Sequence, residues 1–159
     1  MLNTIRQLFS FILPVMVLIV VPLLVEKSWL LALDWITIAG FVVLAAGLGI
    51  LVTSVVSMIR IGKGTLAPWD PAVHLIVTGL YAHTRNPMIT GVLITLLGES
   101  MMVHSLPIFF WMLGFFAFNN IYFSLVEEPL LIKWFGEEYL EYRKNVPRWI
   151  PRLRPWKQG

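Results

Sequence analysis

The chain of 159 residues contains no cysteine, which excludes disulfides, thiolate nucleophiles and cysteine-ligated metal sites. Charged residues are also scarce, at 13% of the chain, whereas a soluble domain carries about a quarter. Hydrophobic residues make up 58%. The composition therefore indicates a membrane protein, and the length suits a single domain over residues 1–159.

Strong basic character is missing as well, because the net charge is only +3. No basic patch with interleaved aromatic residues occurs, so the sequence gives no indication of nucleic-acid binding. The three histidines, His74, His83 and His104, do not have the spacing of metal ligands. The sequence predicts no metal site.

Long apolar runs are what the chain has in abundance. A membrane span requires about 20 apolar residues, with a range of roughly 17–25. Four segments approach this length, and the third and fourth are joined by so short a link that they read as a helical hairpin. The segments cover residues 8–25, 35–59, 88–103 and 106–126. The expected fold class is all-α, a polytopic membrane protein with about four transmembrane helices.

Lysine and arginine predict the orientation of these helices. Four spans would place both termini and the middle loop on one side of the membrane. Eleven of the 12 basic residues fall on that side, and only Lys27 falls on the other. The positive-inside rule then makes both termini cytoplasmic. The compact organisation suggests a prokaryotic cytoplasmic membrane, with two helices in residues 1–61 and the functional part in residues 62–159.

The stretch "YAHTRNPMITG" places an Arg-Asn-Pro turn where the third apolar segment begins. Pro87 suits the first turn of a helix, and Asn86 is a natural N-cap. With Arg85 beside it, the positive end of this helix would form a site for a carboxylate or phosphate. The alternative is a well-capped transmembrane helix with an arginine near lipid phosphates.

The end of the fourth segment supplies polar and acidic residues. Asn120, Ser124 and Glu127 are spaced to share one helix face. Pro129 disfavours helical conformation at Glu128, so a bend is predicted there. Both glutamates would lie level with the Arg-Asn-Pro turn. The alternative is an acidic helix boundary that pairs with basic residues of the tail.

An amphipathic helix along the membrane interface is predicted after Pro129. Its apolar positions recur at helical spacing and comprise Leu131, Trp134 or Phe135, Tyr139 and Tyr142. The basic tail beyond it would bind anionic lipid through Arg148, Arg152, Arg154 and Lys157. Glu99, inside the third segment, is expected to be protonated, bonded to its own helix and structural.

Together these motifs resemble the isoprenylcysteine carboxyl methyltransferase family, which belongs with the phospholipid methyltransferases. The resemblance covers residues 62–151, and Ile89 departs from it where the family usually has tyrosine. The matching residues are Gly79-x-Tyr81-x-x-x-Arg85-Asn86-Pro87, Gly91, Glu127-Glu128, Phe135-Gly136-x-x-Tyr139-x-x-Tyr142 and Val146-Pro147-Arg148.

The resemblance implies a cytoplasmic pocket for S-adenosyl-L-methionine. The helix start would bind the carboxylate of the cofactor, one of the two glutamates its ammonium or ribose, and an aromatic ring its adenine. The cofactor-binding candidates are Tyr81, His83, Asn86, Pro87, Asn120, Glu127, Glu128, Trp134 and Tyr139. The catalytic candidates are Arg85 and Arg148, to hold an acceptor carboxylate, and Glu127.

Carboxyl O-methylation of a lipophilic small molecule or lipidated acceptor is the favoured activity, with membrane lipids as the other partners. Amine N-methylation of a phospholipid is an alternative, and it would need a base such as a glutamate or His83. A sterol-reductase-like enzyme that uses NADPH fits less well, because the larger membrane domain of those enzymes is absent. In a non-enzymatic membrane subunit the polar residues would serve only helix packing.

Overall fold

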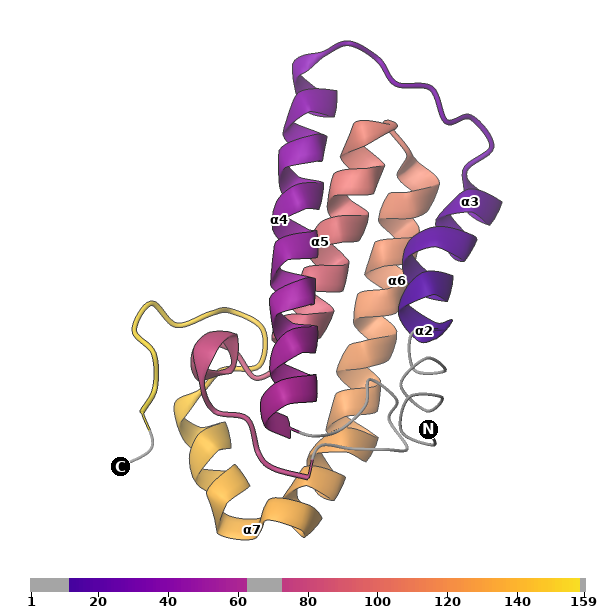
Figure 1. The fold of residues 1–159 in the computed structure, drawn as a ribbon. Helices are drawn as coiled ribbons and strands as arrows, with labels where there is room; N and C mark the ends of the chain where they lie inside the picture. The colour runs from indigo at the N-terminus through magenta and orange to yellow at the C-terminus, as the bar shows by residue number, and fades with distance from the viewer. Residues whose placement is uncertain (1–11, 63–72, 158–159) are drawn as a thin grey trace, which may run out of the picture.

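The structure is a computed structural model that describes residues 12–62 and 73–157 (Figure 1). Every regular element in these two ranges is helical, which confirms the predicted all-α class. The elements are α2 (Ile12–Val15), η1 (Met16–Val20), α3 (Val21–Val25), α4 (Trp35–Ser57), η2 (Met58–Gly62), η3 (Gly79–Ala82), α5 (Pro87–Met102), α6 (Leu106–Tyr122), η4 (Phe123–Glu127) and α7 (Glu128–Asn145). Residues 8–11 of the first predicted segment lie outside the described residues.

The helices α4, α5 and α6 stand side by side, with α5 in the middle (Figure 1). The N-terminal helix, formed by α2, η1 and α3, contacts α6 and the adjoining part of α5. Helix α7 lies at the end of the bundle where α6 finishes, and the chain then returns toward the start of α5 (Figure 1). This return brings the C-terminal part of the chain to the Arg-Asn-Pro turn.

Two continuous helical stretches, Trp35–Gly62 and Leu106–Asn145, are long and apolar enough to cross a membrane. The stretches Ile12–Val25 and Pro87–Met102 are apolar but shorter. The membrane character predicted from composition therefore agrees with the structure, while the count of four spans stays a prediction.

Glycines bring α4 and α5 into backbone contact. A Cβ atom added to Gly98 would lie 2.4 Å from the backbone nitrogen of Leu44, and one added to Gly47 would lie 2.5 Å from that of Thr95. Gly40 and Gly91 are equally crowded by the facing backbone. Such close approach of small residues is how helices associate where no water drives them together.

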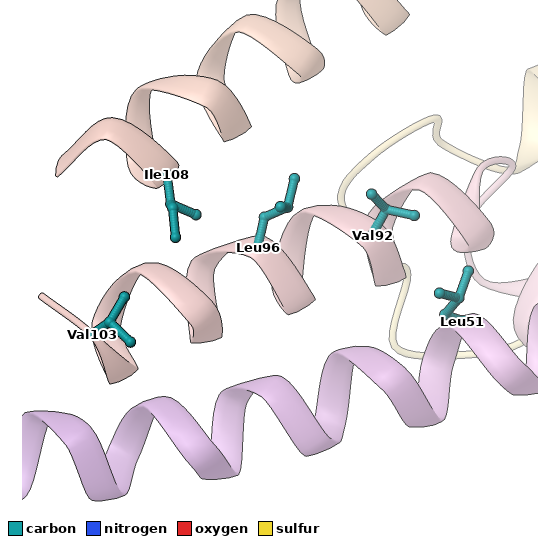
Figure 2. Close-up of a cluster of buried hydrophobic side chains, with 5 residues drawn as sticks. All are labelled: Leu51, Val92, Leu96, Val103 and Ile108. Atoms are coloured by element: carbon teal, nitrogen blue, oxygen red, sulfur yellow. The ribbon is translucent and has the colours of Figure 1, made fainter. Parts of the chain in front are cut away.

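An apolar core lies along α5 and includes residues of both α4 and α6. Val92 and Leu96 project from α5, Val103 directly follows its last residue, and Ile108 of α6 points toward them (Figure 2). Leu96 and Ile108 are completely shielded from solvent. Leu51 of α4 completes this core near the start of α5 (Figure 2).

A proline fixes the N-terminal helix against α6. In the π-helical turn η1 each backbone N–H donates to the carbonyl five residues earlier, as Val21 does to Met16. Pro22 has no N–H group, so the carbonyl of Val17 receives no such bond. The indole N–H of Trp111 donates to that carbonyl at 3.1 Å. The Trp111 side chain of α6 thus supplies the hydrogen bond that Pro22 cannot donate to Val17.

At the far end of the bundle, α4 is tied to the turn between α5 and α6. Asp34 caps α4 by accepting a hydrogen bond from the backbone N–H of Thr37 at 2.8 Å. The same carboxylate lies 3.0 Å from Nε2 of His104, which has a φ of 53°. The left-handed conformation of His104 closes the tight turn of the hairpin.

The predicted bend at Glu128 is wrong. Glu128 is helical, with φ −61° and ψ −42°, and the π-helical turn η4 carries the chain into α7 without a break. Pro129, the second residue of α7, follows this π-helical turn without breaking the helix. The chain breaks instead at Gly136, whose φ of 54° and ψ of −130° lie outside the helical region. Glycine adopts such angles without a steric penalty.

We expect Gly98→Ala to destabilise the protein by about 1–3 kcal/mol, because the added methyl group must push apart two backbones. Gly49→Ala is the matched control, since a Cβ atom on Gly49 in α4 would meet nothing within 4 Å. Thermal unfolding in detergent measures both. Equal melting temperatures for the two variants would contradict the close contact between α4 and α5.

Candidate functional site

The site is centred on Glu128, a buried carboxylate at the start of α7. Its Oε1 atom lies 2.5 Å from Nη1 of Arg85 and 2.5 Å from Nη2 of Arg148. Nη2 of Arg143 lies 3.5 Å from the second oxygen, Oε2. Three guanidinium groups therefore surround one carboxylate, and the cluster carries an excess of positive charge.

The arginines determine the charge state of Glu128. Burial alone raises the pKa of its carboxyl group, but hydrogen bonds from Arg148 and Arg85 outweigh burial, so the net pKa lies below the usual value. Glu128 is thus a carboxylate at neutral pH. It holds together arginines that come from three places in the chain.

Arg85 is held by several protein groups besides Glu128. Its Nε donates to the carbonyl of Val146 at 2.9 Å, and Nη1 donates to the hydroxyl of Tyr139 at 3.1 Å. Its backbone N–H donates to the carbonyl of Pro147, also at 2.9 Å. The structure thus places Arg85, a candidate for holding an acceptor carboxylate, in the interior as an anchor between α5 and α7.

Arg148 is the arginine that meets the polar face of α6. Its Nη1 donates to Oγ of Ser124 at 2.8 Å and to Oδ1 of Asn120 at 3.3 Å, while Nε donates to Glu128 at 3.2 Å. The indole N–H of Trp149 donates to the same oxygen of Asn120 at 3.1 Å. Asn120 and Ser124 are exposed, so this side of the guanidinium borders open space.

Glu128, rather than Glu127, completes the face that contains Asn120 and Ser124. In a regular α-helix the positions i, i+4 and i+7 align, which points to Glu127. The turn η4 is π-helical and holds about one residue more than an α-helical turn. Position i+8, which is Glu128, therefore aligns with Asn120 and Ser124 in place of position i+7. The spacing of polar residues in the sequence gives no signal for this π-turn, a feature that is frequent at functional sites.

Glu127 is half-buried beside this cluster. Burial raises the pKa of its carboxyl group, the neighbouring charge of Glu128 raises it further, and Arg148 offsets part of the effect. Within residues 12–62 and 73–157, no side chain hydrogen-bonds to it. The carboxyl group of Glu127 can therefore still accept hydrogen bonds, unlike that of Glu128.

The segment 81–85 forms the wall of the site opposite α6. We call residues 146–157 the C-terminal strap, because they run along this segment. The strap is bonded to the segment through backbone groups: Trp156 N–H donates to the carbonyl of Ala82 at 2.9 Å, and Arg152 N–H donates to that of His83 at 3.0 Å. The hydroxyl of Thr84 donates to the carbonyl of Arg148 at 2.7 Å.

The predicted cofactor residues Tyr81 and His83 lie in this wall. Nδ1 of His83 lies 2.7 Å from the carbonyl of Arg152. The hydroxyl of Tyr142 donates to the carbonyl of Tyr81 at 2.6 Å. Tyr81 and Tyr139 are buried, and burial raises the pKa of both phenols, so they remain neutral.

Asn86 and Pro87 take the positions predicted for them at the start of α5. Pro87 is the first helical residue and Asn86 is the residue before it. The side chain of Asn86 makes no capping hydrogen bond, contrary to expectation, because its backbone angles of φ −123° and ψ 55° differ from those of a usual N-cap. The start of α5 thus has no side-chain cap.

The apolar positions predicted for α7 are confirmed, with Phe135 rather than Trp134 as the position between Leu131 and Tyr139. Tyr139 and Tyr142 form a small core with Val146, and the ring of Trp156 packs against that of Tyr142 at a tilt of 43°, with ring centroids 5.7 Å apart. The partly buried residues around this core are Leu75, Val77, Leu131, Ile132, Phe135 and Trp156. Trp134 lies outside it with 43% of its surface exposed.

Two further predictions concern the carboxyl group of Glu99 and the grouping of potential metal ligands. One carboxyl oxygen of Glu99, Oε2, is buried without a hydrogen-bond partner among the described residues, so a bond to its own helix is not made by that atom. No group of three or more potential metal ligands occurs in the part of the chain that the structure describes.

Known proteins provide independent information about the chain. The family model described as phospholipid methyltransferase matches residues 35–138. The protein-S-isoprenylcysteine O-methyltransferase of Schizosaccharomyces pombe is 39% identical over 92 residues, which cover 50% of this chain and 34% of that protein. The enzyme of the same name from Rattus norvegicus is 33% identical over 86 residues, which cover 54% and 30%. The chain thus spans about a third of the length of these relatives. No solved structure matches the chain.

We expect Glu128→Gln to cost about 3 kcal/mol of stability, because it leaves buried guanidinium groups without a counter-charge. Glu127→Gln, the adjacent and chemically identical change, should cost little, since it removes no bond among the described residues. Thermal unfolding in detergent without ligand distinguishes them. A larger loss for Glu127→Gln would show that Glu128 is not the centre of the cluster.

Proposed function

The chain belongs to the phospholipid methyltransferase family, and we propose that it is a membrane methyltransferase that uses S-adenosyl-L-methionine to methylate a lipophilic acceptor, with carboxyl O-methylation favoured. The observation that carries this proposal is the cluster in which three arginines surround the single carboxylate of Glu128. Its excess positive charge favours an anionic acceptor. The names of the two relatives support a lipidated one.

The chemistry of the site fits the cofactor. S-adenosyl-L-methionine has a carboxylate, which suits the start of α5 at Asn86 and Pro87, where no side-chain cap is present. It also has an ammonium group, which suits Glu127, whose carboxyl group has no hydrogen bond among the described residues. When bound, the cofactor supplies a methyl group on an electrophilic sulfonium.

A carboxylate acceptor needs no base, because it carries no proton that must be removed. The task of the protein is to orient the acceptor and to keep water away from it. Arg148 is better placed for this than Arg85. The bonds of Arg148 to Asn120 and Ser124 lie on an exposed side where an acceptor carboxylate can replace them, whereas Arg85 is bonded to main-chain carbonyls in the interior.

Amine N-methylation of a phospholipid is the second candidate, and one observation favours it. An amine acceptor must lose a proton, so it needs a base close to the site. The half-buried carboxyl group of Glu127, with its raised pKa, has the properties of such a base. The two activities therefore depend on different residues. A carboxylate acceptor needs Arg148 to orient it, and an amine acceptor needs Glu127 as a base.

We also propose that all four apolar stretches cross the membrane, with both termini and the site on the cytoplasmic side. The hairpin of α5 and α6 supports this arrangement, because α6 begins one of the two helical stretches long enough to span, Leu106–Asn145, and the link from α5 to α6 is short. Helix α5 is about 24 Å long, close to the hydrocarbon thickness of about 30 Å.

The orientation can be tested because the chain has no cysteine of its own. Ser28→Cys, between α3 and α4, should react with a membrane-impermeant maleimide in intact cells. Glu141→Cys, on the exposed side of α7, should react only after the membrane is permeabilised. Reaction of both sites in intact cells would contradict the proposed orientation.

Arg148→Lys should lower methyl transfer to prenylated acids about 10- to 100-fold, since lysine cannot hold a carboxylate with two parallel bonds. The measurement is transfer of a radiolabelled methyl group to a panel of prenylated acids, acyl acids and phosphatidylethanolamine. Thermal shifts with S-adenosylmethionine, S-adenosylhomocysteine and NADPH are measured in parallel. Stabilisation by the first two alone supports a methyltransferase, and stabilisation by none of the three would contradict the proposal.

The same panel separates the two acceptors. If phosphatidylethanolamine is methylated and the acids are not, Glu127→Gln should abolish the activity and Arg148→Lys should spare it. Lys133→Gln on the exposed side of α7 is a control that removes a positive charge away from the cluster.

A further inference from the structure

The C-terminal strap has two faces. Its tryptophans point inward: the ring centroid of Trp149 lies 5.1 Å from that of Phe116 and 6.0 Å from that of Phe123, and the ring of Trp156 packs at a tilt against that of Tyr142. Between them, Ile150 is 81% exposed and Leu153 is 98% exposed. The strap therefore presents large apolar side chains that nothing in the described protein covers.

The exposed apolar residues are flanked by positive charge. Arg154 and Lys157 are exposed, and neither forms an ion pair within the described residues. Arg152 is partly exposed and donates from Nη1 to the carbonyl of Asn145 at 2.7 Å. No acidic residue lies between positions 146 and 157. Any partner of this face must therefore offer both an apolar region and negative charge.

The strap also lies at a specific level of the molecule. In Figure 1 it lies level with the lower part of α4 and with the start of α5, rather than beyond the end of the bundle. Helix α4 belongs to a stretch apolar enough to span a membrane. A segment beside the end of such a helix is at the depth where lipid headgroups meet the hydrocarbon.

We propose that the strap docks on the cytoplasmic leaflet, with Ile150 and Leu153 inserted among the acyl chains and Arg154 and Lys157 bound to the phosphates of anionic phospholipids. Exposed leucine and isoleucine between cations are the combination that this boundary accommodates. A negatively charged protein segment would satisfy the cations but would leave Leu153 in water.

Docking of the strap would act on the site through the backbone bonds already described. The strap is bonded to the carbonyls of Ala82 and His83, and Arg85 follows directly. Lipid that holds the strap in place also holds this wall of the site. The composition of the leaflet thereby becomes a determinant of how well the site is ordered.

The test uses the full chain in lipid nanodiscs, with a single environment-sensitive fluorophore on an introduced cysteine. Leu153→Cys reports on the strap, and Glu141→Cys on the exposed side of α7 is the control. The discs contain phosphatidylcholine with or without phosphatidylglycerol, and lipids with a spin label on the acyl chain serve as quenchers. We expect several-fold stronger quenching at position 153 than at 141, and stronger quenching at 153 when phosphatidylglycerol is present.

The role of the cations is tested with a charge-matched pair of double variants. Arg154→Gln with Lys157→Gln should remove the effect of phosphatidylglycerol, whereas Arg60→Gln with Lys133→Gln, at exposed positions outside the strap, should preserve it. Quenching at position 153 no stronger than at 141 in both lipids would overturn the proposal. Equal quenching at 153 with and without phosphatidylglycerol would overturn the assignment of anionic lipid. No step of this measurement involves methyl transfer, so its result is independent of the proposed function.

Discussion

The ionised carboxylate of Glu128, enclosed by arginines, is the interaction on which the functional end of the molecule depends. A buried charge is tolerated only when it is paired and hydrogen-bonded. Here the partners come from the start of α5, from α7 and from the strap, so satisfying one carboxylate requires three separate parts of the chain to meet. The electrostatic requirement of a single side chain thus fixes the architecture of the site.

The bundle and the site are held together by different interactions. Along its whole length α5 is in backbone contact with α4 through glycines, and it shares an apolar core with α6. These contacts are short-ranged and leave little room for movement. At the site, polar bonds to main-chain carbonyls, as for Arg85 and Thr84, are added to a smaller apolar core around Tyr139 and Tyr142. A closely packed apolar bundle therefore supports a site that is held largely by polar bonds.

The helices were predictable from the sequence, because runs of apolar residues of this length bounded by charge leave few alternatives. Pro87 marked the start of α5 correctly, since its fixed φ suits only certain positions. The register of the acidic residues was not predictable in the same way. A regular helix points to Glu127, and the π-turn before it brings Glu128 into line with Asn120 and Ser124. The bonds of Arg85 to carbonyl groups also leave no trace in a sequence, because every residue has a carbonyl.

The distance along the chain between Arg85 and its partners has a consequence for biosynthesis. Arg85 donates to a carbonyl 61 residues further on, and the carboxylate that neutralises it is 43 residues further on. When the last residue of α5 is added to the growing chain, neither partner has been made. The start of α5 therefore cannot reach its final contacts until α7 and the strap have been synthesised and the strap lies along segment 81–85. Assembly of the polar site is thus the last step in the folding of the bundle.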